Sequence, residues 1–239
     1  MLYLSRSDIE HIAGRITADY TRLPQFDGQG TDRIDPYTLA HDLLGLSIDH
    51  YRLSKNGAIL GLTANSEVGV EIYGDNGEPC IYYLDGKTLL VEKELVSDPA
   101  QRGRYNFTVL HEVAHQILDR MAPQEQGGCR CRVMYYRGIV QQHPSQDWGE
   151  WQADNMASAL LLPAFAVNAA LSRFGLEGGI DILNRIYRPK EYQRFCDMAE
   201  YLGASKQALA IRLRRLGLLK TEYLRNPQSM VDIEKDGDG

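Results

Sequence analysis

The segment of residues 107–120 carries His111, Glu112 and His115 among apolar residues spaced as in an α-helix. Residues four apart lie on the same face of a helix, so the two imidazoles point the same way and are close enough to bind one cation. Glu112, next to the first histidine, is able to reach a water molecule on that cation. This H-E-x-x-H spacing predicts a hydrolytic zinc site with two histidine ligands and Glu112 as general base.

The same pattern also arises by chance, with both histidines as core residues whose ring nitrogens are hydrogen-bonded. Apolar residues at Leu110, Ala114 and Leu118 indicate that most of this helix is buried. Two histidines and a carboxylate in a buried helix are costly without a metal or several hydrogen bonds. The sequence therefore favours a metal.

A catalytic zinc needs a third protein ligand and one open position. The metzincin continuation is absent, because Leu118 and Met121 stand where it has glycine and histidine. Glu150 and Asp154 lie four residues apart in the helical segment 147–163, whose alanines allow close packing. We expect Glu150 to be the third ligand and Asp154 to accept the free ring N–H of a ligand histidine. The alternative is a solvated acidic face near a helix N-terminus.

Three stretches between about residues 35 and 163 carry a more specific resemblance. They are DPYTLAHDLLGLSIDHYRL with GAILGLTA, then YNFTVLHEVAHQILD, then EWQADNMASALLLP. In this order they resemble the ImmA/IrrE family of zinc metallopeptidases of the gluzincin type. The resemblance implies one zinc ion per chain, held by His111, His115 and Glu150, with Glu112 as base. It also implies a narrow protein substrate, a helix-turn-helix repressor whose cleavage relieves transcriptional repression of stress or mobile-element genes.

Helices and short strands must position these residues. Ser7 with Glu10 predicts a capping box and a first helix ending near Pro24, and Asp35 before Pro36 predicts a second helix. Five segments rich in β-branched and aromatic residues are separated by turn residues, as in an antiparallel meander. They are residues 47–53, 57–64, 69–74, 79–84 and 87–92.

The helix with the two histidines is predicted to begin with Asn106 as N-cap and to end before Pro123. Pro163 ends the helix with Glu150, and the chain is expected to be helical again to about Arg225. The predicted fold is α+β, a zincin-like metallopeptidase core of helices and a small antiparallel sheet. We expect a peptidase domain at 1–165, a helical helix-turn-helix-like subdomain at 166–226 and a disordered acidic tail at 227–239.

The second subdomain is basic, with 11 Lys or Arg against 6 Asp or Glu between residues 171 and 225. Its segment DMAEYLGASKQALAIRLRRLGLL predicts a helix, a glycine turn and a helix capped by Ser205, as in a helix-turn-helix. One interpretation is contact with DNA or an acidic partner by the polar residues Lys206, Gln207, Arg212, Arg214 and Arg215. The favoured alternative is a solvated face, with packing onto the peptidase domain by Leu202, Ala208, Leu209, Ile211, Leu213 and Leu216.

Weaker signals lie between the two ligand-bearing helices. Cys129, Cys131 and His143 suggest a second metal, but no fourth ligand stands at a suitable spacing. Stabilisation of an oxyanion needs a further donor. Candidates are Tyr135, Tyr136, His143 and residues of the C-terminal helices, and ordinary half-buried packing is the alternative for each tyrosine.

Composition limits the remaining classes. The chain has 239 residues, a net charge of −6 and only four cysteines, which are too few for a disulfide framework. No apolar run is long enough for a membrane span, so a cytoplasmic protein without membrane partners is expected. The predicted activity is that of a zinc-dependent endopeptidase. Its rival is a transcription regulator or protein-binding module with a structural or vestigial metal.

Overall fold

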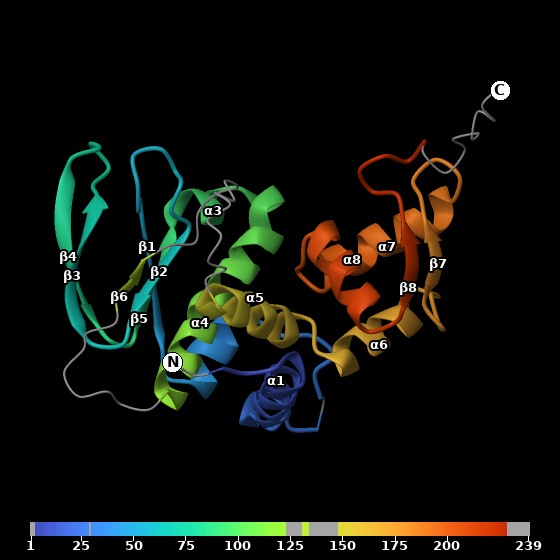
Figure 1. The fold of residues 1–239 in the computed structure, drawn as a ribbon, viewed down its shortest axis with the longest axis horizontal. Helices are drawn as coiled ribbons and strands as arrows, with labels where there is room; N and C mark the ends of the chain where they lie inside the picture. Colours follow the sequence, from blue (N-terminus) through green and yellow to red (C-terminus); the bar gives the residue numbers. More distant parts are fainter. Residues whose placement is uncertain (1–2, 29, 123–130, 134–147, 229–239) are drawn as a thin grey trace, which may run out of the picture. The chain divides into compact units, whose positions relative to one another are not determined.

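A computed structural model describes residues 3–28, 30–122, 131–133 and 148–228. The chain divides into two compact units, Met1–Pro163 and Ala164–Gly239, where the sequence placed the division after residue 165. Helices and strands occur in both units (Figure 1), so the predicted α+β class is confirmed. Most of the predicted tail, from residue 229 on, lies outside the described residues.

The first unit contains most of the strands and the helices that carry the predicted site. Its elements are α1 (Arg6–Tyr20), η1 (Pro24–Phe26), α2 (Pro36–Thr38), η2 (Leu39–Leu43), β1 (Ser47–Tyr51), β2 (Gly61–Ala64), β3 (Glu67–Tyr73), β4 (Pro79–Asp85), β5 (Thr88–Glu92), α3 (Lys93–Ser97), η3 (Pro99–Gln101), α4 (Arg102–Met121), β6 (Cys131–Val133) and α5 (Trp148–Leu161).

The strands form a four-stranded sheet in the order β1-β5-β2-β6 and a separate two-stranded hairpin of β3 and β4. β2 pairs antiparallel with β5 and β6, whereas β1 pairs parallel with β5. All five predicted strands exist, but the prediction of one antiparallel meander is wrong. Parallel neighbours need a long connection, and the chain between β1 and β5 supplies it by forming β2 and the hairpin.

Strand β2 is buried on both faces, and its successive side chains point alternately to the β3–β4 hairpin and to α4. Leu62 and Ala64 contribute to the apolar cluster formed with the β3–β4 hairpin. Gly61 and Thr63 face α4 instead, since their nearest partners there are Glu112 and Gln116. The helix with the two histidines is therefore held directly against the middle of the sheet.

Helix α4 packs against β2 and β5 on one side and against α5 on the other, and α1 in turn packs on α5 (Figure 1). Its apolar residues Val109, Leu110, Val113 and Ala114 are fully buried. Because α4 is covered on both sides, all residues of its central turns, from Thr108 to Gln116, are buried.

Helix α1 begins two residues earlier than the capping box predicted. Ser5 is the N-cap: its Oγ accepts from the Asp8 amide at 3.2 Å, and Asp8 Oδ2 accepts from the Ser5 amide at 2.8 Å. Ser7 and Glu10 therefore lie inside the helix. Both pairs have the spacing of a capping box, and the earlier one satisfies the free amides of the first turn.

The cap predicted at Asp35 is confirmed, because its Oδ1 accepts from the amide of Thr38 at 2.8 Å. The helix that follows is irregular. After the three residues of α2 it continues as a π-type turn, η2, and ends before Gly45, whose φ of 65° is in the left-handed region.

Helix α4 begins four residues before the predicted N-cap. Asp98 followed by Pro99 opens the short 3-10 turn η3, and Asp98 Oδ1 accepts from the amide of Ala100 at 2.9 Å. This turn leads into α4 at Arg102, so that Asn106 is a buried residue of the helix interior. An Asp-Pro pair is a start signal of the same kind as the one at Asp35.

The sequence predicted an entirely helical second unit. This prediction is wrong, because β7 and β8 form a parallel pair in it. The predicted helix, glycine turn and capped helix are present: Gly203 has a φ of 63°, and Ser205 Oγ accepts from the Ala208 amide at 3.1 Å. The elements of this unit are α6 (Ala164–Arg173), β7 (Ile180–Leu183), α7 (Pro189–Tyr201), α8 (Lys206–Arg215) and β8 (Leu219–Glu222).

In the described part of the chain, no helix taken alone has the length and apolar composition to cross a membrane. Only α5 and α6 counted together, as a bent pair, meet that criterion.

Candidate metal centre

The two histidines of α4 converge as their spacing predicts. His111 and His115 are 1% and 3% exposed, and their Nε2 atoms lie 3.0 Å apart. The rings are nearly perpendicular, with an interplanar angle of 80° and centroids 4.7 Å apart. Each imidazole therefore directs the same nitrogen to one point beside the helix.

Helix α5 brings Glu150 to that point. Its Oε2 lies 3.1 Å from His111 Nε2, and its Oε1 lies 3.3 Å from His115 Nε2. Zinc binds such nitrogen and oxygen ligands at about 2.0–2.2 Å, which places the ligand atoms of a tetrahedral site about 3.3 Å apart. The three donors thus stand close to the separations that one zinc ion requires.

The close approach of α5 to α4 depends on small side chains. Gly149, Ala153 and Ala157 are all buried, and the two helices are in extensive contact. The alanines that the sequence analysis singled out lie on the buried face of α5 together with Glu150, which is only partly exposed. The alternative of a solvated acidic face therefore does not hold for Glu150, whereas Asp154 is exposed.

Asp154 lies one turn after Glu150 and holds the outer nitrogen of one histidine. Its Oδ1 is 3.0 Å from His111 Nδ1. This contact favours the tautomer in which Nδ1 carries the proton and the lone pair of Nε2 faces the centre. The corresponding Nδ1 of His115 is buried without a partner among the described residues.

The electrostatics of the centre favour positive charge. Burial lowers the pKa of His111, but its hydrogen bonds with Asp154 and Glu150 outweigh burial and raise this pKa to about 10. For Glu150, burial raises the pKa, and the hydrogen bonds with His111 and His115 outweigh it and bring the pKa to about 2. The carboxylates therefore create a field that stabilises a cation where the ring nitrogens meet.

Glu112 lies beside the two histidines in the interior. It is 1% exposed, and burial raises the pKa of its carboxyl group. Its Oε2 has no hydrogen-bond partner among the described residues. A buried carboxylate oxygen without a partner is expensive, as is the unpartnered His115 Nδ1. The unpartnered oxygen of Glu112 and the N, N, O donor set fit a metal centre in which polar groups serve a ligand instead of the core.

Two residues of this neighbourhood were not anticipated. Gln116 is buried, and its Nε2 donates to Thr63 Oγ1 at 2.7 Å and to the carbonyl of Ala64 at 2.6 Å. Gly61 lies directly against Glu112. A glycine inside a strand pattern signals close backbone approach, and that signal was present in GAILG.

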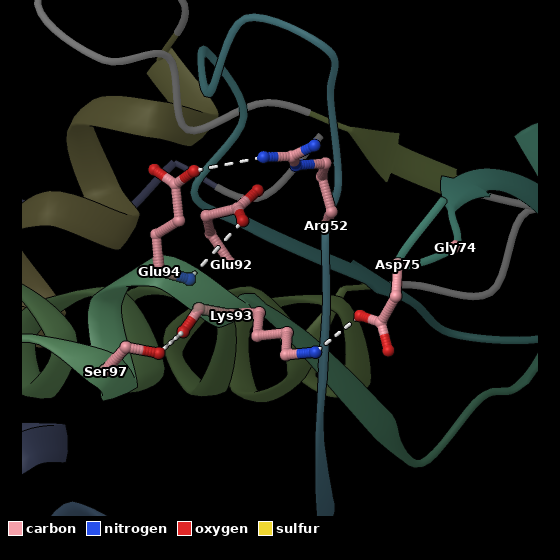
Figure 2. Close-up of a pocket in the computed structure, with 7 residues that line it drawn as sticks. All are labelled: Arg52, Gly74, Asp75, Glu92, Lys93, Glu94 and Ser97. Atoms are coloured by element: carbon pink, nitrogen blue, oxygen red, sulfur yellow. Dashed lines mark hydrogen bonds and ion pairs between the residues drawn. The ribbon is translucent and has the colours of Figure 1, made fainter. Parts of the chain in front are cut away.

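A pocket lined by charged residues lies at the end of β5, away from the centre (Figure 2). It has a volume of about 230 Å³, and its charges are already paired: Lys93 with Asp75 at 2.6 Å and Arg52 with Glu94 at 3.4 Å. Glu92 Oε2 accepts from the Leu53 amide at 2.9 Å. The two ion pairs attach α3 to the neighbouring strands and turns. The pocket offers no donor set comparable to that of His111, His115 and Glu150.

Other predicted site residues lie outside the described residues: Cys129, Tyr135, Tyr136, His143 and the side chain of Cys131. In the described ranges, His111, His115 and Glu150 are the only group whose donor atoms, all within 4.8 Å of one another, are arranged to hold a metal.

Most of the basic residues of α8 are exposed, as both interpretations expect, whereas Arg212 and Ile211 differ from them. Arg212 is 1% exposed, so it belongs neither to a nucleic-acid surface nor to a solvated face. Ile211, expected to be packed, is 40% exposed. Arg214 pairs with Glu222 at 3.2 Å, and Lys206 lies over the ring of Tyr192. The ion pair with Glu222 offsets part of the positive charge that α8 presents.

Comparison with protein-family models and with curated proteins gives no match for this chain. The assignment of the centre therefore rests on its donor atoms, their distances and their burial.

Proposed function

We propose that the protein is a zinc-dependent hydrolase, and more narrowly a peptidase. The observation that carries this proposal is the convergence of His111, His115 and Glu150, with donor atoms within 4.8 Å of one another. Structural zinc sites use four protein ligands, whereas hydrolytic sites use three and leave one position open. Three donors with a buried carboxylate at Glu112 correspond to the second type.

In this proposal, His111, His115 and Glu150 hold the metal and Asp154 fixes the ring of His111. Zinc, when bound, supplies Lewis acidity toward a carbonyl oxygen and acidifies water. Glu112 takes the proton of the attacking water on its carboxylate and passes it to the leaving amine. Its burial suits this role, because a raised pKa makes a carboxylate a better proton acceptor near neutrality.

The peptide substrate rests on the ImmA/IrrE resemblance rather than on the geometry. We propose that it is a helix-turn-helix repressor, whose cleavage relieves repression. The decisive experiment compares wild type, Glu112→Gln and His115→Ala for zinc content and for cleavage of a co-encoded repressor. We expect Glu112→Gln to keep zinc and lose cleavage, and His115→Ala to lose both. Equal cleavage by wild type and Glu112→Gln contradicts the mechanism.

A second candidate function is transcription regulation or protein binding with a structural metal. The observation that favours it is the pair of helices α7 and α8 joined by the turn at Gly203. The burial of Arg212 removes one of the side chains on which DNA contact depended. Sequence-specific DNA binding that survives Glu150→Ala, without proteolysis by wild type, favours this second function over the first.

A further inference from the structure

Strand β2 and helix α4 lie side by side, and every second residue of the strand contacts every fourth residue of the helix. Gly61 lies against Glu112, and Thr63 lies against Gln116. Four residues of a helix advance about 6 Å, and two residues of a strand advance about 6.6 Å. The strand therefore meets α4 at two consecutive turns of one helix face, and the first of these contacts is at Glu112.

The contact at Gly61 leaves no space for any side chain. A Cβ at this position would lie 2.8 Å from Glu112 Cγ and 2.9 Å from Cδ, and closer still to Oε1. Real Cβ atoms essentially never approach other heavy atoms so closely. Glycine is not needed here for its backbone conformation, since Gly61 does not have a positive φ. Its absent side chain is what admits the carboxylate of Glu112.

The backbone at Gly61 is held in place by the sheet. Gly61 is in register with Val91 of β5, and the carbonyl of the preceding Leu60 accepts from the Glu92 amide at 2.8 Å. On the other side of the contact, the two hydrogen bonds of Gln116 hold α4 against β2. Neither backbone is therefore free to withdraw, and the side chain of Glu112 is the part that would yield.

We propose that Gly61 is the positioning residue for the carboxylate of Glu112. Strand β2 forms a wall that fixes where this carboxylate stands relative to His111 and His115. Any side chain at position 61 displaces the carboxylate while the metal ligands remain in place. This inference rests on the proposed hydrolase function, to which it adds the group that sets the geometry of the base.

The first test is Gly61→Ala beside Gly14→Ala, a matched control because a Cβ at Gly14 of α1 meets nothing within 4 Å. We expect Gly61→Ala to bind zinc as wild type does and to lose at least about a hundredfold in kcat, since a misplacement of about 1 Å can cost that much. KM should stay within about twofold. If the wild type is active and Gly61→Ala has the same kcat, the inference about Gly61 is overturned and the proposed function stands. If the wild type neither binds zinc nor hydrolyses peptide, the proposed function is overturned.

A second test needs no substrate. In Co²⁺-loaded protein, the pH midpoint of the visible absorption change reports on the carboxylate that contacts metal-bound water. We expect Gly61→Ala to shift this midpoint in the same direction as Glu112→Gln, and Gly14→Ala to leave it unchanged. An unshifted midpoint in Gly61→Ala, where Glu112→Gln does shift it, overturns the inference.

A double-mutant cycle covers the case in which Gly61→Ala folds poorly. Glu112→Ala removes the three atoms that would lie nearest to the new Cβ, so the effect of Gly61→Ala on the melting temperature should largely disappear in that background. If Gly61→Ala lowers the melting temperature equally in both backgrounds, the steric conflict is not with Glu112 and the inference is overturned.

Discussion

At the scale of single residues, the two histidines of the centre differ in what holds their outer nitrogens. His111 Nδ1 is fixed by Asp154 at 3.0 Å, whereas His115 Nδ1 has no partner among the described residues. Orientation of a ligand ring by a carboxylate raises its basicity and fixes its tautomer. Asp154 is therefore the residue outside the three donors on which metal affinity should depend most.

We predict that Asp154→Asn weakens zinc binding by about 10- to 100-fold, the usual cost of losing such a partner. The measurement is competition with a chelator of known affinity. The control is Asp181→Asn, which removes an exposed carboxylate that pairs with Lys220 in the second unit. Equal affinities of wild type and Asp154→Asn would contradict the role given to this carboxylate.

Glu92 offers a test of pH dependence away from the candidate metal ligands (Figure 2). It is 2% exposed, and burial raises the pKa of its carboxyl group above the ordinary 4.5. The folded chain therefore binds this proton more tightly than the unfolded chain does. Its contribution to stability is most favourable below pH 4.5 and declines as the pH rises through the raised pKa.

We predict that Glu92→Gln, which does not titrate, gains stability relative to wild type as the pH rises from about 4 to 7. The melting temperatures of both proteins, measured at several pH values in one ionic strength, test this difference. Glu78→Gln is the control, because Glu78 is exposed. A difference between Glu92→Gln and wild type that is constant or declines with pH would show that burial does not raise this pKa.

At the scale of elements, the helices of the centre could be predicted because their signals are local. The spacing of His111, Glu112 and His115 depends only on helix periodicity, and Pro163 marks the end of α5 directly. The alanines of α5 indicated which face packs. The convergence of the three candidate donors could therefore be predicted from two helices and from the requirement that a metal have a third ligand.

Strand partners could not be predicted in the same way, because pairing is decided by packing between distant segments. The pattern of β1 does not reveal that its neighbour is the parallel strand β5. Strands β7 and β8 lie in a region whose apolar spacing suited helices. Gly61 and Gln116 were missed for the same reason: their roles exist only once β2 lies against α4.

The contact between Gln116 and β2 predicts an effect on stability. Gln116→Leu keeps the approximate size of the side chain but leaves Thr63 Oγ1 and the carbonyl of Ala64 without their buried donor. We expect a loss of about 1–3 kcal/mol in the free energy of unfolding, measured by urea denaturation. Gln193→Leu, at an exposed position of α7, should change it by less than about 0.5 kcal/mol; a similar loss in both variants would contradict the importance of this contact.

At the scale of the whole molecule, the candidate metal ligands and both tryptophans belong to the same unit. Trp148 and Trp151 are the only tryptophans of the chain, and both lie in α5 on either side of Glu150 in the sequence. Their rings are stacked with centroids 4.6 Å apart, and Arg6 of α1 lies 6.0 Å from the ring of Trp151. Tryptophan fluorescence therefore reports on the unfolding of the unit that carries the candidate metal centre.

We predict that zinc added to chelator-treated protein raises the fluorescence melting temperature of this unit. Binding to the folded state alone contributes about 2.7 kcal/mol when free zinc is a hundredfold above its Kd, or roughly 5–10 °C for a unit of this size. His115→Ala should show no such rise, because two donors do not complete the site. An equal rise in wild type and His115→Ala would mean that zinc acts elsewhere on the chain, and the three donors of α4 and α5 would then not be its ligands.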